Sequence, residues 1–198
     1  MKTLVLASAS ATRQAMLRTA GVTFAVEPAA IDEPALMQAL VAKDSRAEAV
    51  ASALAQEKAL DVSRRRPGET VLGGDSVLAL GRDILGKSPD LAALKTLLLR
   101  LSGRDHHLVS AAALARDGDI LWHHVATVRM TVRLLSATFV DAYLARGGEA
   151  LLSSVGGYHF EGLGAQLFES VQGDYFSILG MPLLPVLAAL RAEGLLET

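Results

Sequence analysis

The segment from Glu69 to Pro89, ETVLGGDSVLALGRDILGKSP, constrains this chain more than any other stretch. Its apolar runs predict a strand that continues through Val77–Leu80, a turn at Gly81-Arg82 and a short return strand at Ile84-Leu85. Asp75 follows two glycines inside the predicted strand, although glycine weakens a strand interior and aspartate is depleted in strands. Because well-patterned chains break local rules mainly at functional sites, Asp75 is the first candidate site residue.

Lys87 lies twelve residues after Asp75, so a hairpin over this segment would return it to the same cleft. A carboxylate and an ammonium that face one cleft are the minimum set for metal-assisted phosphate chemistry. The segment therefore predicts a site for a phosphorylated ligand.

The start of the chain predicts a second element that binds anions. A buried strand over Thr3–Ala7 leads into a small polar loop and then into a helix with Ser10 as its expected N-cap. Free backbone N–H groups and the helix dipole would point at an anion held in that loop. Arg13 in the first turn opposes the dipole, and spacing alone favours a solvated arginine over one with an anionic partner.

The rest of the pattern predicts the fold class. We expect a second strand over 22–27, a hairpin about Asp117-Gly118 and a strand over 165–171. Helices are expected over 47–60, 91–101 and 136–144 and from Pro182 onward, where proline suits the first helical position. Strands and helices alternate early and a long hairpin follows, which predicts an α/β or α+β fold with a mixed central sheet.

Two further groups of charges have simple local explanations. Asp32 and Glu33 stand in a predicted loop over 28–34, where acids before a proline usually serve the turn. Glu57-Lys58 would ordinarily be a solvated helix face. Spacing alone therefore assigns no function to these residues.

Composition narrows the function classes. Apolar residues make up 51% and charged residues 20%, which is typical of a soluble globular enzyme. The formal charge of 19 − 21 = −2 favours neither a nucleic-acid partner nor a membrane surface. The absence of cysteine excludes disulfides, thiol catalysis and cysteine-ligated zinc. The adjacent histidine pairs His106-His107 and His123-His124 fall in predicted strands, so we interpret them as sheet residues and not as metal ligands.

Segments that would direct the chain to a membrane are too short. The apolar run Leu4–Leu6 is far below the ~7–15 residues of a secretory signal core. Ile178–Leu190 contains Gly180, Pro182 and Pro185 and is below the ~18 residues that span a bilayer. We therefore expect a cytoplasmic protein.

Common nucleotide and hydrolase motifs are missing from the sequence. It contains no GxxxxGK[ST], no GxGxxG after the first strand and no GxSxG. What remains is an anion-binding first loop, an acid on a glycine-rich strand and a lysine after a hairpin. This combination favours hydrolysis of a phosphoanhydride.

Four blocks of the chain resemble the Maf family. LASASATRQAMLRTAG is similar to its opening motif ASxSPRRxxLLxxxG, and GGDSVLALGRDILGKSPD is similar to GADTVVxxxGxxLGKPxD. LRLSGRDHHLVSAAAL resembles LxxLSGxxHxVxTAVxL, and GGYHFEGLGAQLFESVQGDYFSILGMPL resembles AGAYGIQGxGAxLxxxIxGxYxxVVGLPL. The blocks come in family order and cover nearly the whole chain, which is therefore identified as a single Maf-like domain over residues 1–198.

The resemblance implies a fold and an activity. The fold would be a mixed α/β, Maf/ITPase-like architecture with a cleft between two lobes, often as a homodimer. The activity would be a house-cleaning pyrophosphatase of nucleoside triphosphates, which cuts the α–β bond with a divalent cation, Mg²⁺ or Mn²⁺. The alternative from another class is a nucleotide-binding regulator of septum formation without turnover. Retention of the charged residues favours the enzyme, because unpaired charges in a cleft cost stability.

The resemblance also assigns roles to residues. Asp75 falls on the family's catalytic aspartate, which is proposed to activate water, and Glu33 on its conserved second acid, so that these two would hold the metal. Substrate binding falls on five residues: Ser8, Ser10, Arg13, Lys58 and Lys87. For Arg13, Glu33 and Lys58 this reverses the interpretation from spacing.

This chain departs from the family pattern at the three positions that set base specificity. The pyrimidine-specific branch carries Arg, Thr and Gln, where this chain has Thr12, Ser76 and Glu161. The 7-methyl-GTP branch carries Glu at the last position but bulky residues at the first two, so the chain fits neither branch. A carboxylate accepts the two adjacent N–H donors of guanine, which predicts a preference for a guanine-type base. The alternative is that Glu161 faces solvent and the enzyme is promiscuous.

Overall fold

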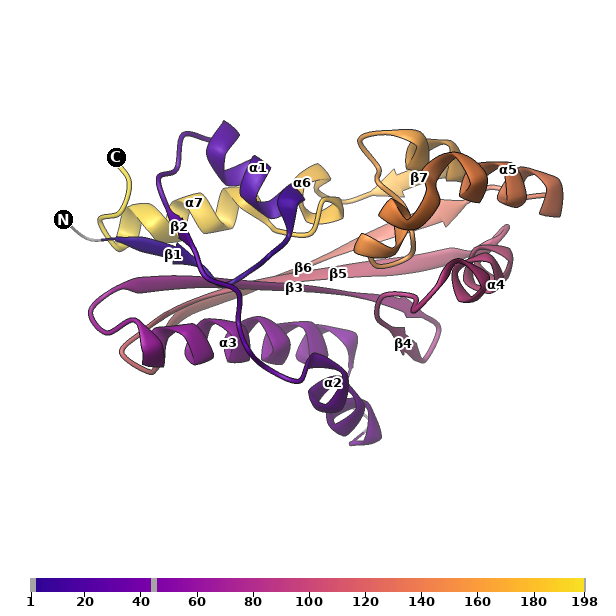
Figure 1. The fold of residues 1–198 in the computed structure, drawn as a ribbon. Coiled ribbons are helices and arrows are strands. Elements are labelled where there is room, and N and C mark those ends of the chain that lie inside the picture. Colours follow the sequence, from indigo (N-terminus) through magenta and orange to yellow (C-terminus); the bar gives the residue numbers. More distant parts are fainter. Residues whose placement is uncertain (1–2, 44–45, 198) are drawn as a thin grey trace.

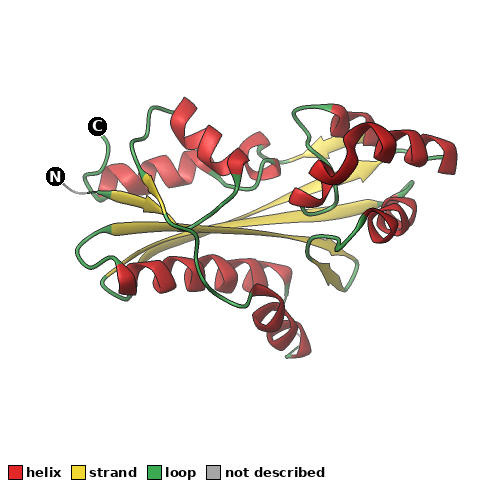
Figure 2. Ribbon diagram, viewed as in Figure 1, coloured by secondary structure: helices red, strands yellow, loops and turns green. Residues whose placement is uncertain are grey.

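The computed structural model describes residues 3–43 and 46–197, so both ends of the expected 1–198 domain lie outside the described part. A mixed sheet runs through the molecule, with helices on both of its faces (Figures 1 and 2). Its described strands lie in the order β2-β1-β3-β5-β6-β7, with β4 paired to β3. The strands are β1 (Leu4–Leu6), β2 (Ala25–Val26), β3 (Thr70–Leu80), β4 (Asp83–Leu85), β5 (Asp105–Arg116), β6 (Asp119–Val132) and β7 (Phe168–Gln172).

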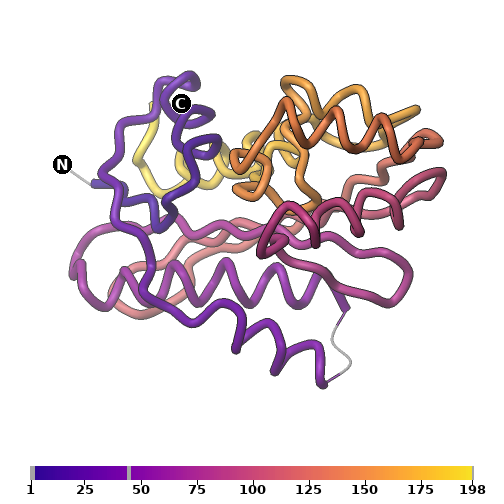
Figure 3. The backbone as a smooth tube through the Cα atoms, turned by 45° about the vertical axis from the view of Figure 1, so that its right-hand side comes forward, coloured from indigo at the N-terminus to yellow at the C-terminus, as the bar shows by residue number. Residues whose placement is uncertain are grey.

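The helices divide into groups over the sheet. They are α1 (Ala11–Thr19), α2 (Glu33–Ala42), α3 (Ala47–Arg65), α4 (Leu91–Leu101), α5 (Ala137–Gly147), α6 (Tyr175–Ile178) and α7 (Leu183–Ala192), with 3₁₀ turns η1 (Gly148–Ser153) and η2 (Leu163–Leu167). Figures 1 and 3 show α3 along one face of the long strands, and α1, α6 and α7 on the other face near the chain termini. Helices α4 and α5 lie together at the far end.

The core follows this division. The α3 face packs small residues against the strands, among them Ala51, Ala55, Ala59 and Ala111, all fully buried. A second cluster joins β1, α1 and α7, and a third joins α4 and α5 to the far ends of β5 and β6. Small side chains along α3 let it approach the sheet closely, and this approach positions the site described below.

Several predicted elements are confirmed. The mixed sheet has β1 parallel to β2 and β3, while the remaining pairs are antiparallel. The β5–β6 hairpin turns at Asp117 and Gly118 with φ of 52° and 86°, the left-handed conformations that an Asp-Gly turn supplies. Ser10 caps α1, and the predicted helix over 91–101 is α4. The hairpin over 69–85 is β3–β4.

Other predicted boundaries are wrong, because tertiary partners decided them. The strand expected over 22–27 has only two residues, since β2 pairs with β1 at two positions alone. The strand expected over 165–171 begins at Phe168, because residues 163–167 form η2, in which Gly164 N donates to His159 O. The predicted 28–34 loop ends early, because Asp32 caps α2 and Pro34 is accommodated in its first turn. Pro182 is the N-cap of α7 and not its first residue.

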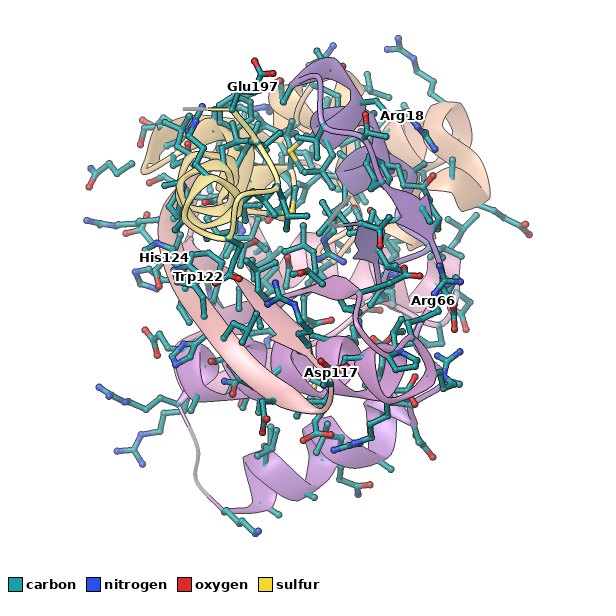
Figure 4. All side chains as sticks on the ribbon, turned by 90° about the vertical axis from the view of Figure 1, so that its left-hand side faces the viewer. Arg18, Arg66, Asp117, Trp122, His124 and Glu197 are labelled. Atoms are coloured by element: carbon teal, nitrogen blue, oxygen red, sulfur yellow. The ribbon has the colours of Figure 1, made fainter. Side chains whose placement is uncertain are left out.

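The histidines of the hairpin are strand residues, as expected. His106 is buried, and its Nε2 lies 2.9 Å from the Tyr158 hydroxyl. His124 stacks on Trp122 along β6, with 6.1 Å between the ring centroids (Figure 4). Across residues 3–43 and 46–197, every helix is too short or too polar to cross a membrane.

Candidate functional site

A cavity of about 780 Å³ lies beside β3, where the strand has an open edge. Strand β1 pairs with Thr70–Leu72 on that edge and β4 pairs with Leu78–Leu80. Within the described residues, the stretch between them, 73–77, has no strand partner on this side. Asp75 is at the middle of that stretch, and Asp75, Ser76 and Val77 border the cavity. The opening lies beyond the carboxyl end of the parallel strand β1, where α/β folds commonly bind ligands.

The structure brings nearly all predicted site residues to this cavity. Its wall includes Ser10, Thr12, Arg13, Glu33, Lys58, Asp75, Ser76, Lys87 and Glu161. Ser8 is buried behind the wall and contacts Arg13. Lys87 is exposed and lines the cavity with Asp75, as the hairpin predicted.

On the α3 side of β3, a lysine joins two carboxylates. Lys58 Nζ lies 2.6 Å from Asp75 Oδ1 and 2.9 Å from Glu33 Oε2. Lys58 and Asp75 are buried, with 6% and 7% of their surface exposed, whereas half of the Glu33 side chain is exposed. A buried ammonium needs such partners, because an unpaired charge is costly to remove from water. The interpretation of Lys58 as a solvated helix residue is therefore wrong.

On the opposite face of β3, Arg13 is held by three acceptors. Its Nε donates to Gly180 O at 2.8 Å, Nη1 to Ser8 Oγ at 3.2 Å and Nη2 to Ser76 Oγ at 3.2 Å. Burial lowers the pKa of Arg13 from its ordinary value, and the negative charges of Asp75 and Glu33 oppose this shift. A solvated arginine, which spacing favoured, is thus not what the structure has.

This arrangement leaves part of the Arg13 guanidinium available to a ligand. A guanidinium carries five N–H groups, and three are used by the contacts above. Among the described residues the other two, one on each terminal nitrogen, have no acceptor. Ser8 Oγ accepts from Ser10 N and from Arg13, so Ser8 supports the guanidinium from behind the cavity wall. With the N-terminus of α1 beside them, these donors suit a phosphate group.

The far wall of the cavity is a loop anchored in the core. Tyr158 contacts His106, and Tyr143 donates from its hydroxyl to Gly157 O at 2.8 Å. Burial raises the pKa of Tyr158 well above its usual range, so its hydroxyl remains a neutral hydrogen-bonding group. Glu161 extends from this loop as an exposed side chain, with its Oε1 4.0 Å from His159 Nδ1. This anchored loop therefore carries an accessible carboxylate.

A second, apolar cavity of about 630 Å³ adjoins the first. It is lined mainly by α1 residues and by Phe176, Leu179 and Leu183. Thr12 and Glu161 belong to the walls of both cavities. Thr12 and Glu161 therefore lie at the junction of the two cavities.

Sequence reasoning missed the buried serines behind the site. Ser76 Oγ lies 2.8 Å from Ser110 Oγ, and Ser110 donates to Ser177 O at 2.8 Å. Ser110 and Ser177 are fully buried. Their polarity within apolar strand and helix patterns was the available signal, but their contacts span 34 and 67 residues of sequence.

The buried His106 beside Tyr158 makes folding stability depend on pH. Burial lowers the pKa of His106 from 6.5 to about 4. Below pH 6.5 His106 is therefore protonated in the unfolded chain, whereas in the folded chain it stays neutral down to about pH 4. Folding stability is therefore lost as the pH falls through this window. Between pH 7 and pH 4.5 we expect wild type to lose about 2–3 kcal/mol more unfolding free energy than His106→Asn does.

Urea unfolding of both proteins at the two pH values measures this difference. His123→Asn, at an exposed position of β6, is the matched control and should behave as wild type. An equal pH response in wild type and His106→Asn would contradict the prediction.

The acidic residues of the site would hold a metal together with oxygens of a bound ligand. In the described part of the chain, no three His, Asp or Glu side chains gather as a metal-binding group. Asp75 and Glu33 converge on Lys58 and supply two carboxylates. Since Mg²⁺ is commonly held by one or two carboxylates together with waters and substrate phosphates, this donor set fits a shared metal.

Comparison with known proteins places the chain among named relatives. The family model of Maf-like proteins matches residues 3–193. A 7-methyl-GTP pyrophosphatase of Brucella abortus is 48% identical over 194 residues, which cover 98% of each chain. Proteins named nucleoside triphosphate pyrophosphatase are 48% identical in Granulibacter bethesdensis, over 95% of each chain, and 49% identical in Rhodopseudomonas palustris, over 98% of this chain and 95% of that one.

Proposed function

This chain belongs to the Maf family, and on that premise we propose that it is a nucleoside triphosphate pyrophosphatase acting as one domain. It hydrolyses the α–β phosphoanhydride and releases a nucleoside monophosphate and pyrophosphate, a house-cleaning reaction on unwanted nucleotides. The observation that carries the assignment is one cavity with Arg13 on one side of β3 and the Lys58–Asp75 pair on the other.

The phosphates are proposed to bind at the start of α1. Two N–H groups of Arg13 have no acceptor among the described residues and offer donors to phosphate oxygens, and Ser10 caps the helix whose N-terminus faces them. Ser8 supports this site by holding the Arg13 guanidinium. Lys87, which is exposed and lines the cavity, adds a positive charge. Together they offset the negative charge that would repel an incoming nucleophile.

Asp75 is proposed to accept the proton of the attacking water. Its Oδ1 accepts from Lys58, and its Oδ2 has no donor among the described residues and so can accept this proton. The water oxygen forms a bond to the α-phosphorus, the bridging bond to the β-phosphate breaks, and pyrophosphate leaves with the electron pair. Lys58 holds the carboxylate in place and places a positive charge beside it.

Asp75 and Glu33 would hold the divalent cation, Mg²⁺ or Mn²⁺, with oxygens of the substrate phosphates. When bound, such a cation neutralises phosphate charge and lowers the pKa of bound water. Glu33 is suited to this because half of its side chain remains exposed although it reaches Lys58.

The decisive experiment for the function is a nucleotide panel. Purified protein is incubated with GTP, 7-methyl-GTP, dTTP, UTP and ATP, each with Mg²⁺ or Mn²⁺, and pyrophosphate is measured. Release of pyrophosphate with an equal amount of monophosphate is expected. Release of orthophosphate instead, or no release from any nucleotide, would contradict the proposal.

Glu161 is proposed to select the base. Its carboxylate is exposed at the edge of the cavity, where the two adjacent N–H donors of a guanine edge can both be accepted. Thymine and uracil present one N–H between two carbonyls, which would repel the second carboxylate oxygen. Methylation at N7 adds a positive charge that the carboxylate also favours, and relatives named 7-methyl-GTP pyrophosphatase agree with this choice.

Replacing Glu161 by glutamine is expected to weaken the preference for a guanine-type base over a pyrimidine. We expect kcat/KM for 7-methyl-GTP to exceed that for dTTP by about 10–100-fold in wild type, the discrimination of one to two well-placed polar contacts. In Glu161→Gln the ratio should fall about tenfold or more, because an amide both donates and accepts. Glu169→Gln, an exposed change on β7, is the control. A wild type that prefers dTTP, or a variant with the wild-type ratio of kcat/KM for 7-methyl-GTP and dTTP, would exclude this role.

A further inference from the structure

We propose that Ser110 is a positioning residue for Arg13, acting through Ser76. Ser110 does not line the cavity, and the family resemblance assigned it no role. The inference rests on the proposed function only in that Arg13 binds the phosphates. It follows from the direction in which hydrogen bonds must run between these groups.

The contacts form one continuous series of hydrogen bonds from the cavity into the core. Arg13 Nη2 lies 3.2 Å from Ser76 Oγ, Ser76 Oγ lies 2.8 Å from Ser110 Oγ, and Ser110 Oγ lies 2.8 Å from Ser177 O. These residues come from α1, β3, β5 and α6. The members farthest from the cavity, Ser110 and Ser177, are fully buried.

Ser177 O can only accept a hydrogen bond and Arg13 can only donate one, and this determines the direction of each hydrogen bond between them. Ser177 O is a carbonyl oxygen and can only accept, so the single proton of Ser110 points to it. Ser110 Oγ must then accept from Ser76, which spends its proton there. Arg13 has no acceptor and can only donate, so it meets a Ser76 lone pair.

The far end of the chain is itself held in place. Asp174 Oδ2 accepts from Ser177 N at 2.7 Å and from Ser177 Oγ at 2.6 Å, which caps α6. The turn after α6 returns to the site, because Gly180 O accepts from Arg13 Nε at 2.8 Å. Arg13 is thus oriented through Ser76 on one side and through the Gly180 turn on the other.

Loss of Ser110 would disturb this orientation more than it would disturb the fold. Ser177 O would keep a second donor, Gly180 N at 3.1 Å. The Ser76 proton would turn to Gly180 O, which is already 3.3 Å away, and the lone pair that receives Arg13 would turn with it. Each carbonyl among these contacts keeps a donor, but the guanidinium loses one of the three contacts that orient it.

The test compares three variants with wild type in steady-state pyrophosphate release. Ser110→Ala is expected to lower kcat/KM by about tenfold, mainly through KM, since one hydrogen bond that orients a charged group is lost. Ser110→Thr should stay within about threefold of wild type, because it keeps the hydroxyl. Ser110→Val has the shape of Thr without the hydroxyl, so it should resemble Ser110→Ala, and any packing strain is common to Thr and Val.

A double-mutant cycle completes the test. In a Ser76→Ala background, Ser110→Ala should lower kcat/KM by less than about twofold, because the hydrogen bond that links Ser110 to Arg13 through Ser76 is already lost. Equal activity of the Thr and Val variants, or a full tenfold loss in the Ser76→Ala background, would overturn the inference. A wild type without turnover would instead count against the proposed function, and in that case binding of a nucleoside triphosphate by wild type and the same variants decides the role of Ser110.

Discussion

Asp75→Asn is expected to reduce pyrophosphate release by at least about 100-fold, the contribution of one general base. Asparagine has nearly the same shape but cannot take a proton from water, and it is a weaker partner for a cation. The fold should survive, because an amide oxygen can still accept from Lys58, which also keeps Glu33 at 2.9 Å. The measurements are kcat with 7-methyl-GTP and the thermal unfolding midpoint.

Asp141→Asn is the matched control for this variant. Asp141 belongs to α5 and pairs with Lys95 at 2.5 Å on the surface, remote from the cavity wall. It should keep wild-type turnover. If Asp75→Asn also turns over at near the wild-type rate, Asp75 is removed from the mechanism, whereas a large loss of unfolding temperature would assign it mainly to stability.

Gly73→Ala is expected to lower the unfolding free energy by about 3 kcal/mol, at the upper end of ordinary overpacking costs. A β-carbon at Gly73 would collide with the backbone of α3, at Ala55 O and at Ala59 N, the latter 2.7 Å away. Backbone cannot turn aside as a side chain can, so the whole helix must move outward. For a chain of this length we expect the unfolding midpoint to fall by about 6–12 °C.

Gly74→Ala separates this effect from one on the site. Its added β-carbon would meet the Arg13 side chain at 3.3 Å, which is flexible, and Ala111 O at an ordinary 3.5 Å. We expect a small change in unfolding temperature but a higher KM, because Arg13 is displaced. Equal unfolding temperatures for Gly73→Ala and Gly74→Ala would contradict the close approach of α3 to β3.

Gly73 also corrects the interpretation of the glycine-rich strand. The sequence pattern marks the pair of glycines beside Asp75 as a sign of function, because glycine weakens a strand. The structure shows that Gly73 serves packing, since it lets α3 approach until Lys58 reaches Asp75. Gly74 makes room for Arg13 on the other face. Packing and function therefore share one dipeptide.

The sequence by itself determined those features that depend on a few neighbouring residues. Asp117-Gly118 specified the β5–β6 hairpin, because these residue types tolerate positive φ. Asp90 begins α4 as its N-cap, and Gly103 is a left-handed residue just after its end. Ser10 began α1 for the same local reason. In each case the preference arises within one turn of backbone.

Only the tertiary structure decided which charges are buried and what they meet. Local spacing placed Lys58 and Arg13 in solvent, yet Lys58 pairs with Asp75 across seventeen residues and Arg13 with Gly180 O across 167. The Ser110 contacts also join strands and helices far apart in sequence. A charge on a helix prefers water unless another segment supplies a partner, and that partner exists only after the long-range packing of α3, α1 and α6 on the sheet has formed.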